Sequence, residues 1–172
     1  DFYNKWKNYT KIPASTGAAS SSASSEVLGV GVGSYGLAYP LPQATGIAAY
    51  TYSGHTHHAR DFQPPNAKWG TPVVAVLDGT VLAAGNGVED WSYGNSVYID
   101  HGNGWMSRYA HLDSIAVARG QSVKKGQKLG GCGSTGNSSG LHLHLEVHSP
   151  WGWIDPGPLY SNYGYCYLTG SE

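Results

Sequence analysis

The chain has 172 residues, of which 25 are Gly, 13 are Tyr and 12% are Asp, Glu, Lys or Arg. Soluble domains average about 25% charged residues, so this chain carries about half the usual charge. Ten basic and eleven acidic residues give a formal net charge of −1, which excludes the basic surface of a protein that binds nucleic acid or an anionic membrane. Because there is no heptad pattern and no run of about 18 apolar residues, coiled-coil and membrane-spanning folds are also excluded. Eight His among so few charged side chains are therefore the first candidates for a functional site.

Composition divides the chain into a leader, one domain and a short tail. Residues 1–38 begin with aromatic residues and lysines and continue through a Ser- and Ala-rich tract at 13–25. This tract is too poor in apolar side chains to fold, so it predicts a flexible linker. Residues 39–160 are expected to form the domain, and residues 161–172 a C-terminal tail. Since the chain starts at Asp1 and not at Met, we expect a mature or excised domain.

Within the expected domain, short apolar runs alternate with turn residues. Runs at 73–77 and 80–84 flank Asp78-Gly79, a strong hairpin signal, and runs at 96–100 and 105–110 flank a Gly-containing turn at 101–104. Residues 128–132 and 141–148 predict further strands, and no stretch after residue 26 has the helical period of 3.6. The sequence therefore predicts an all-β fold, a small antiparallel β sandwich or open barrel.

The two cysteines, Cys132 and Cys166, are far apart in sequence and form no Cys-x-x-Cys motif. Outside the cytosol such a pair predicts a structural disulfide. It would close a loop of about 35 residues and contribute about 3–4 kcal/mol in the chain-entropy model. The alternative is two buried, reduced thiols.

The strongest local pattern is the alternation of apolar and polar residues at 141–148, Leu-His-Leu-His-Leu-Glu-Val-His. Such alternation predicts a strand with two unlike faces. One face carries His142, His144, Glu146 and His148 and the other carries the apolar side chains. Neighbouring positions on one face lie roughly 6–7 Å apart, close enough for two imidazoles to converge on one site.

A second cluster, His55-Thr-His57-His-Ala-Arg-Asp61, supplies further metal-binding side chains. In an extended chain His57 and Asp61 share a face, and imidazole and carboxylate are both suitable zinc ligands. Together with His144 they make three protein ligands, as in a catalytic zinc site whose fourth position is left for water. His142 would then act as acid or base on that water. His111, in Tyr-Ala-His111-Leu, is by itself no more than a strand-end His.

These three segments, in this order, resemble the lysostaphin-type zinc endopeptidases that cut bacterial peptidoglycan. The family pattern is His-x-Gly-x-Asp, then Tyr-Ala-His-Leu, then Thr-Gly-x-Ser-x-x-x-His-Leu-His-Phe-Glu. Here the segments are residues 57–61, 109–112 and 135–146, and the similarity runs from about residue 39 to residue 159. Three positions depart from the pattern: Ala59 replaces Gly, Leu141 replaces Pro and Leu145 replaces Phe. None is a ligand, so these departures affect only the fine geometry of the groove.

The resemblance implies a role for each matching residue. His57, Asp61 and His144 would hold one Zn²⁺ per chain, in a groove between loops. His111 and His142 would lie beside the water that the metal activates, with His142 as general base and His111 as its partner. The implied substrate is a peptide bond in the stem or cross-bridge of peptidoglycan. The implied protein is an extracellular, cell-wall or phage virion enzyme, and we expect a monomer.

Other classes of function are weighed against this one. There is no His-Glu-x-x-His motif, so the sequence excludes a zincin. The alternative is a non-catalytic wall-binding or amidase-activating module on the same fold. All five key positions are retained in this sequence, which argues against that alternative. Aromatic residues near the expected site, Trp91 and Tyr93 among them, are candidates either for the groove wall or for the core. The sequence does not indicate which peptidoglycan bond is cut.

Overall fold

The computed structural model describes residues 36–41, 48–50, 59–63, 68–88, 90–154, 156 and 166–168. Most of the predicted leader, the linker at 13–25 and the ligand candidate His57 lie outside the described residues, as does most of the predicted tail.

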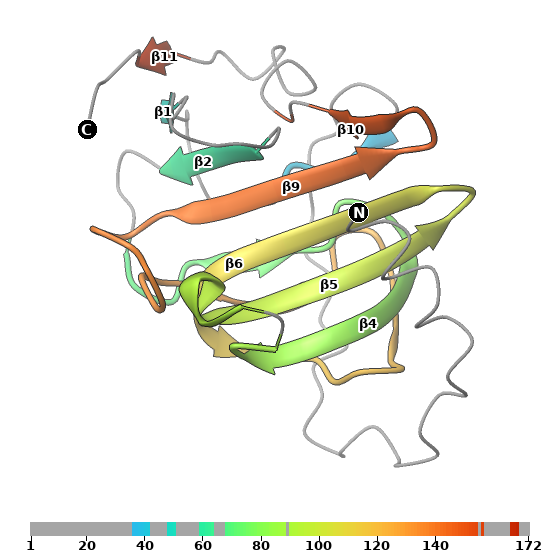
Figure 1. Cartoon of the computed structure of the whole chain (residues 1–172), viewed down its shortest axis with the longest axis horizontal. Helices are drawn as coiled ribbons and strands as arrows, with labels where there is room; N and C mark the ends of the chain where they lie inside the picture. Colours follow the sequence, from blue (N-terminus) through green and yellow to red (C-terminus); the bar gives the residue numbers. More distant parts are fainter. Residues whose placement is uncertain are drawn as a thin grey trace.

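The described part of the chain is a single open sheet (Figure 1). Its strands lie in the order β11-β1-β2-β9-β6-β5-β4-β7, while β8 pairs with both β6 and β3, and β10 pairs with β9. All pairs are antiparallel except β1 with β11. The predicted antiparallel all-β fold is confirmed, and the sheet does not close into a barrel. The strands are β1 (Ala48–Tyr50), β2 (Ala59–Gln63), β3 (Pro72–Val74), β4 (Gly79–Asn86), β5 (Asn95–Gly102), β6 (Trp105–Ile115), β7 (Ser122–Val123), β8 (Lys128–Cys132), β9 (Leu143–Ser149), β10 (Gly152–Ile154) and β11 (Cys166–Leu168).

Helical structure contributes little to the described residues. The described residues include a 3-10 turn, η3 (Trp91–Tyr93), which Asp90 caps by accepting a hydrogen bond from the Ser92 backbone N–H. In the part of the chain that the structure describes, no helix has the length and apolarity needed to cross a membrane.

The central strands β9, β6, β5 and β4 place most of their apolar side chains on one face of the sheet. Leu143, Leu145 and Val147 of β9 are all buried in the main core, which they enter from alternate positions of the strand. The main core also contains these buried side chains from the neighbouring strands: Val81, Val97, Ile99, Tyr109 and Leu112. The polar residues between them, His144 and Glu146, project from the opposite face. The alternation predicted for this strand is therefore confirmed.

One predicted hairpin is present and another is not. The runs around residues 101–104 form β5 and β6, which pair directly. The runs that flank Asp78-Gly79 become β3 and β4, which do not pair, since β3 pairs with β8 and β4 with β5 and β7. The hairpin prediction at Asp78-Gly79 is therefore wrong. Gly79 instead allows its strand to approach β5 closely, because a Cβ there would come within 3 Å of the Asp100 carbonyl oxygen and the Ile99 side chain.

The predicted disulfide is also wrong, because Cys132 is a free thiol buried in the main core. Its strand, β8, pairs with β6, whereas Cys166 lies in β11 at the far edge of the sheet. In the strand order β1, β2 and β9 lie between β11 and β6, the partner of β8, so the two cysteines lie on strands that are not neighbours. Bridged cysteines have Cα atoms within about 7 Å of each other. The alternative of a buried, reduced thiol holds for Cys132.

We expect the Cys132 thiol to resist alkylation in the folded protein. Burial raises its pKa to about 12, against the hydrogen bond from the Gly133 backbone, so the reactive thiolate is scarce at pH 8. Peptide mapping after iodoacetamide treatment should find residue 132 unmodified in native protein and fully modified in guanidinium-unfolded protein. Equal labelling of both samples, or a peptide that links residues 132 and 166, would contradict the prediction.

Candidate active site

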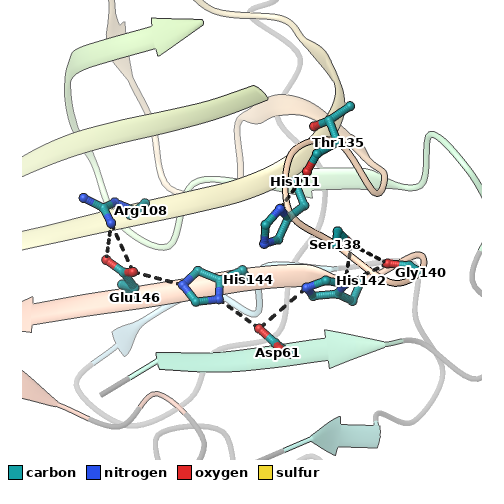
Figure 2. Close-up of polar contacts among 9 residues, drawn as sticks. All are labelled: Asp61, Arg108, His111, Thr135, Ser138, Gly140, His142, His144 and Glu146. Carbon is teal, nitrogen blue, oxygen red and sulfur yellow. Dashed lines mark hydrogen bonds and ion pairs between the residues drawn. The ribbon is translucent and has the colours of Figure 1, made fainter. Parts of the chain in front are cut away.

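Three adjacent strands bring three of the predicted site residues, Asp61, His111 and His144, together on the polar face of the sheet (Figure 2). Asp61 of β2 is the register partner of His144 of β9, and His144 is in turn opposite Ala110 of β6. His111 is the next residue along β6. Asp61 and His144 are 83 positions apart in sequence, and pairing between the strands is what makes them neighbours.

His144 lies between two carboxylates. Its Nδ1 is 3.0 Å from Oδ1 of Asp61, and its Nε2 is 2.9 Å from Oε1 of Glu146. Burial opposes the charged form of the ring, but the hydrogen bonds to Asp61 and Glu146 outweigh it and raise the pKa of His144 to about 9. The ring is buried and Asp61 is partly exposed, so the site opens on the Asp61 side.

His142 precedes β9 and does not lie within it, as the alternation had suggested. It forms an isolated bridge with Gly133, at the other end of the loop that joins β8 to β9. Its Nδ1 is 2.8 Å from the Gly140 carbonyl oxygen and 3.3 Å from Oγ of Ser138. The ring turns its Nε2 towards Asp61, at 3.8 Å from Oδ1 (Figure 2).

His111 has the left-handed backbone conformation, with φ of 62°, which is uncommon for a residue other than Gly and is often retained at functional sites. Its Nδ1 is 2.7 Å from the Thr135 carbonyl oxygen. Its ring centroid lies 4.8 Å from that of His142 and 5.7 Å from that of His144. Burial, followed by repulsion from His142, lowers the pKa of His111 to about 4, against the hydrogen bond to Thr135.

The imidazoles of His111 and His142 are held in the same way. A carbonyl oxygen can only accept a hydrogen bond, so Nδ1 of His111 and Nδ1 of His142 each carry the hydrogen. In the neutral ring Nε2 then keeps its lone pair and can take up a proton. The β8–β9 loop supplies both carbonyl groups, from Thr135 and Gly140, and therefore orients two proton acceptors towards one place.

Gly94, just after η3, supports this loop through a close backbone contact. It has φ of 61° and ψ of −137°, a combination that only Gly adopts readily. A Cβ at this position would lie 2.4 Å from the Thr135 carbonyl carbon. The contact therefore presses η3 directly against the backbone group that holds His111.

We expect Gly94→Ala to destabilise the protein by about 2–3 kcal/mol through backbone strain and overpacking. We also expect kcat to fall, because the Thr135 carbonyl must move away from His111. The matched control is Gly102→Ala, whose φ of 78° is similar but whose Cβ would meet nothing within 4 Å. Chemical denaturation and turnover assays should show a smaller loss of stability, with no loss of kcat, for the control. Equal effects of the two substitutions would contradict the role of the contact.

The donor atoms present fit a zinc ion. Two ligands that share a tetrahedral zinc at about 2.0–2.1 Å lie roughly 3.3 Å apart, and Nδ1 of His144 and Oδ1 of Asp61 are separated by 3.0 Å. The described residues include no group of three His, Cys, Asp or Glu side chains arranged to hold a metal. The third predicted ligand, His57, lies outside the described residues, so that prediction stays a prediction.

Sequence reasoning gave little weight to two residues near the site. Arg108 of β6 is buried and contacts both oxygens of Glu146 at 3.1–3.2 Å. Tyr93 of η3 packs against His144, with ring centroids 5.7 Å apart. No local pattern marks Arg108, because its partner lies 38 positions away. His148, further along the same face of β9, is buried, with Nδ1 3.3 Å from the Gly104 carbonyl oxygen.

Comparison with known proteins identifies the family. The profile described as Peptidase family M23 matches residues 55–156, which include all five predicted site residues. The chain belongs to Peptidase family M23, and the resemblance to lysostaphin-type enzymes is confirmed at this level.

Curated relatives in the family have different functions. The chain is 44% identical over 91 residues to the peptidoglycan DD-endopeptidase ShyA of Vibrio cholerae, covering 53% of this chain and 20% of that protein. It is 40% identical over 87 residues to the murein hydrolase activator NlpD of Escherichia coli, covering 51% of this chain and 22% of that protein. The chain thus spans about a fifth of the length of these relatives.

Solved structures share the fold. The catalytic domain of the antimicrobial peptidase lysostaphin from Staphylococcus simulans aligns with a TM-score of 0.53 and 32% identity, covering 66% of this chain and 86% of that one. A zinc-containing peptidase from Vibrio cholerae aligns with a TM-score of 0.54 and 32% identity, covering 68% of this chain and 37% of that one.

Proposed function

We propose that this chain is a zinc metalloendopeptidase that hydrolyses a peptide bond in the stem or cross-bridge of bacterial peptidoglycan. The observation that carries the proposal is the convergence of Asp61 and His144 with the imidazoles of His111 and His142 on one face of the sheet. Asp61, His144 and His57 would hold the metal. The named activity of ShyA, a peptidoglycan DD-endopeptidase, supports a wall substrate, and hence action in the cell wall or outside the cell.

The chain's own side chains supply the proton transfers. When bound, zinc polarises the scissile carbonyl group and lowers the pKa of the attacking water. His142 accepts the proton of that water at Nε2, the nitrogen turned towards Asp61. The imidazolium ring then donates a proton to the leaving amine. His111, with its ring centroid 4.8 Å from that of His142, is the second group that can hold a proton.

The Gly140 and Thr135 carbonyls keep these rings in the productive tautomer. Each accepts a hydrogen bond from Nδ1 and leaves Nε2 as the basic nitrogen. A general base must present its lone pair to the proton it removes, and this arrangement presents the lone pairs before substrate arrives.

The proposal is tested by metal content and wall lysis. Purified protein should contain about one zinc ion per chain and should clear a suspension of purified peptidoglycan. A chelator should stop the clearing and added Zn²⁺ should restore it. Mass spectrometry of fragments released from walls of defined cross-bridge type identifies the bond. Stoichiometric zinc without chelator-sensitive lysis of any wall would overturn the enzyme proposal.

A second candidate is a non-catalytic module that binds the wall or activates a hydrolase. The similarity to NlpD, named a murein hydrolase activator, favours it. Under this alternative the protein releases no fragments by itself but increases fragment release by an added amidase. The four convergent site residues favour the enzyme, because an activator needs no pair of basic imidazoles beside a metal.

A further inference from the structure

Behind His144 the structure places a chain of buried polar contacts that ends in a cation enclosed by aromatic rings. Glu146 lies two residues after His144, on the same face of β9, and its Oε1 is 2.9 Å from Nε2 of His144. Arg108 in turn contacts Glu146 from the neighbouring strand. These residues face away from the main core, so filling that core does not explain them.

We propose that Glu146 is a positioning residue that fixes His144 as an Nδ1 ligand, and that Arg108 holds Glu146 in place. This inference rests on the proposed zinc site. A carboxylate accepts a hydrogen bond at Nε2, so that nitrogen carries a hydrogen and Nδ1 is left for the metal, on the side of Asp61.

The contact between Arg108 and Glu146 is a buried ion pair. Arg108 and Glu146 are register partners on β6 and β9, and their side chains are 4% and 1% exposed. Nη1 of Arg108 lies 3.2 Å from Oε1 of Glu146 and 3.1 Å from Oε2. A buried carboxylate of this kind requires a partner charge, because an isolated one is strongly disfavoured in a protein interior. Arg108 therefore supplies a partner charge for Glu146 directly behind the proposed metal ligand.

Two tyrosine rings fix the guanidinium group. The central carbon of the guanidinium lies 4.0 Å from the ring centroid of Tyr93 and 4.4 Å from that of Tyr98, within the range of a cation–π contact. Tyr98 is the register partner of Arg108 on β5. Tyr93 also packs against His144, so one ring contacts both Arg108 and His144, the last and first residues of this series of polar contacts.

A purely structural role does not account for the position of this pair. Buried ion pairs are often no more stabilising than apolar side chains of similar volume. The same face already holds a small apolar cluster of Leu82, Tyr98 and Met106, so an apolar pair would be compatible with the surroundings. What an apolar pair lacks is an acceptor for Nε2 of His144.

The test is zinc affinity, measured by competition with a chromophoric chelator on the purified chain. Glu146→Ala should weaken zinc binding by about 10–100-fold, the range found when a residue that supports a ligand is removed. Glu146→Gln keeps a carbonyl oxygen for Nε2 and should stay within about 10-fold of wild type and bind more tightly than the Ala variant. The absorption spectrum of bound Co²⁺, which reports ligand geometry, should change for Ala and change less for Gln.

Controls separate positioning from general loss of stability. Val123→Ala removes a buried side chain from β7, remote from the site, and should lower the melting temperature while leaving zinc affinity unchanged. If Glu146→Ala fails to fold, Arg108→Lys takes its place. Lys keeps the charge but loses the planar guanidinium group that packs against Tyr93 and Tyr98, so zinc affinity should fall by about 3–10-fold.

The outcomes distinguish this inference from the proposed function. Wild-type protein that binds no zinc overturns the proposed function and this inference with it. Wild-type protein that binds zinc, with equally tight binding by the Glu146→Ala variant (or by Arg108→Lys where the Ala variant does not fold), overturns this inference alone. Weaker binding by these variants, with Val123→Ala unchanged, supports it.

Discussion

Replacing His144 with Ala is expected to remove both zinc and peptidoglycan hydrolysis. The imidazole supplies Nδ1, the nitrogen 3.0 Å from Oδ1 of Asp61, so the substitution leaves the proposed site with two protein ligands instead of three. Loss of a ligand should cost more than the loss of a residue that supports one, and zinc affinity should therefore fall by more than about 100-fold. Hydrolysis should fall to the level of a blank without protein.

Zinc content measured by mass spectrometry, and clearing of purified peptidoglycan, check this expectation. His148→Ala is the matched control, because His148 lies four positions further along the same face of β9. Its Nδ1 is 3.3 Å from the Gly104 carbonyl oxygen, which is in the turn between β5 and β6. The control should keep both zinc and activity. A His144→Ala protein that retains stoichiometric zinc would show that His144 is not a ligand.

Replacing His142 with Ala is expected to remove turnover while leaving the metal in place. Its Nε2 approaches Asp61 only at 3.8 Å, whereas His144 contacts the same oxygen at 3.0 Å, so we assign proton transfer and not ligation to His142. General-base catalysis contributes about 10²–10⁴-fold, and kcat should fall by that amount. Stability should change little, since the ring is partly exposed and its partners, Ser138 and the Gly140 carbonyl, can bind water instead.

Two measurements on the same preparation check this expectation. One is the turnover rate at saturating substrate, and the other is the zinc content. His142→Asn serves as a further variant, because its amide can still donate to the Gly140 carbonyl but cannot act as a base. It should keep zinc and be as inactive as the Ala variant. Full activity of His142→Ala would make the assignment of the general base wrong, and His111 would then be the remaining candidate.

The sequence predicted the parts of the site that depend on local pattern. Alternation in residues 141–148 correctly placed His144 and Glu146 on one face, because a strand has a period of two regardless of what it pairs with. The Gly-containing turn at 101–104 likewise predicted the β5–β6 pair. The same pattern assigned His142 to the strand, and this was wrong. His142 lies in the loop before β9, where it forms an isolated bridge with Gly133.

Contacts between distant strands were beyond local pattern. Asp78-Gly79 has the residues of a hairpin turn, yet β3 and β4 each pair with other strands. Cys132 and Cys166 are separated by strands whose order no spacing reveals. Arg108 and Glu146 are likewise register partners only in the folded sheet.

The sequence by itself determined the chemistry available to this protein: an unusual number of His for a chain of low charge, on motifs that place it in Peptidase family M23. The tertiary structure decided which of those groups meet. It set Asp61 opposite His144, turned Nε2 of His142 towards Asp61 through the Gly140 carbonyl, and placed Arg108 behind Glu146. The physical reason is that strand alternation is encoded within a few residues, whereas strand order and register are fixed by burying one common apolar face across the whole sheet.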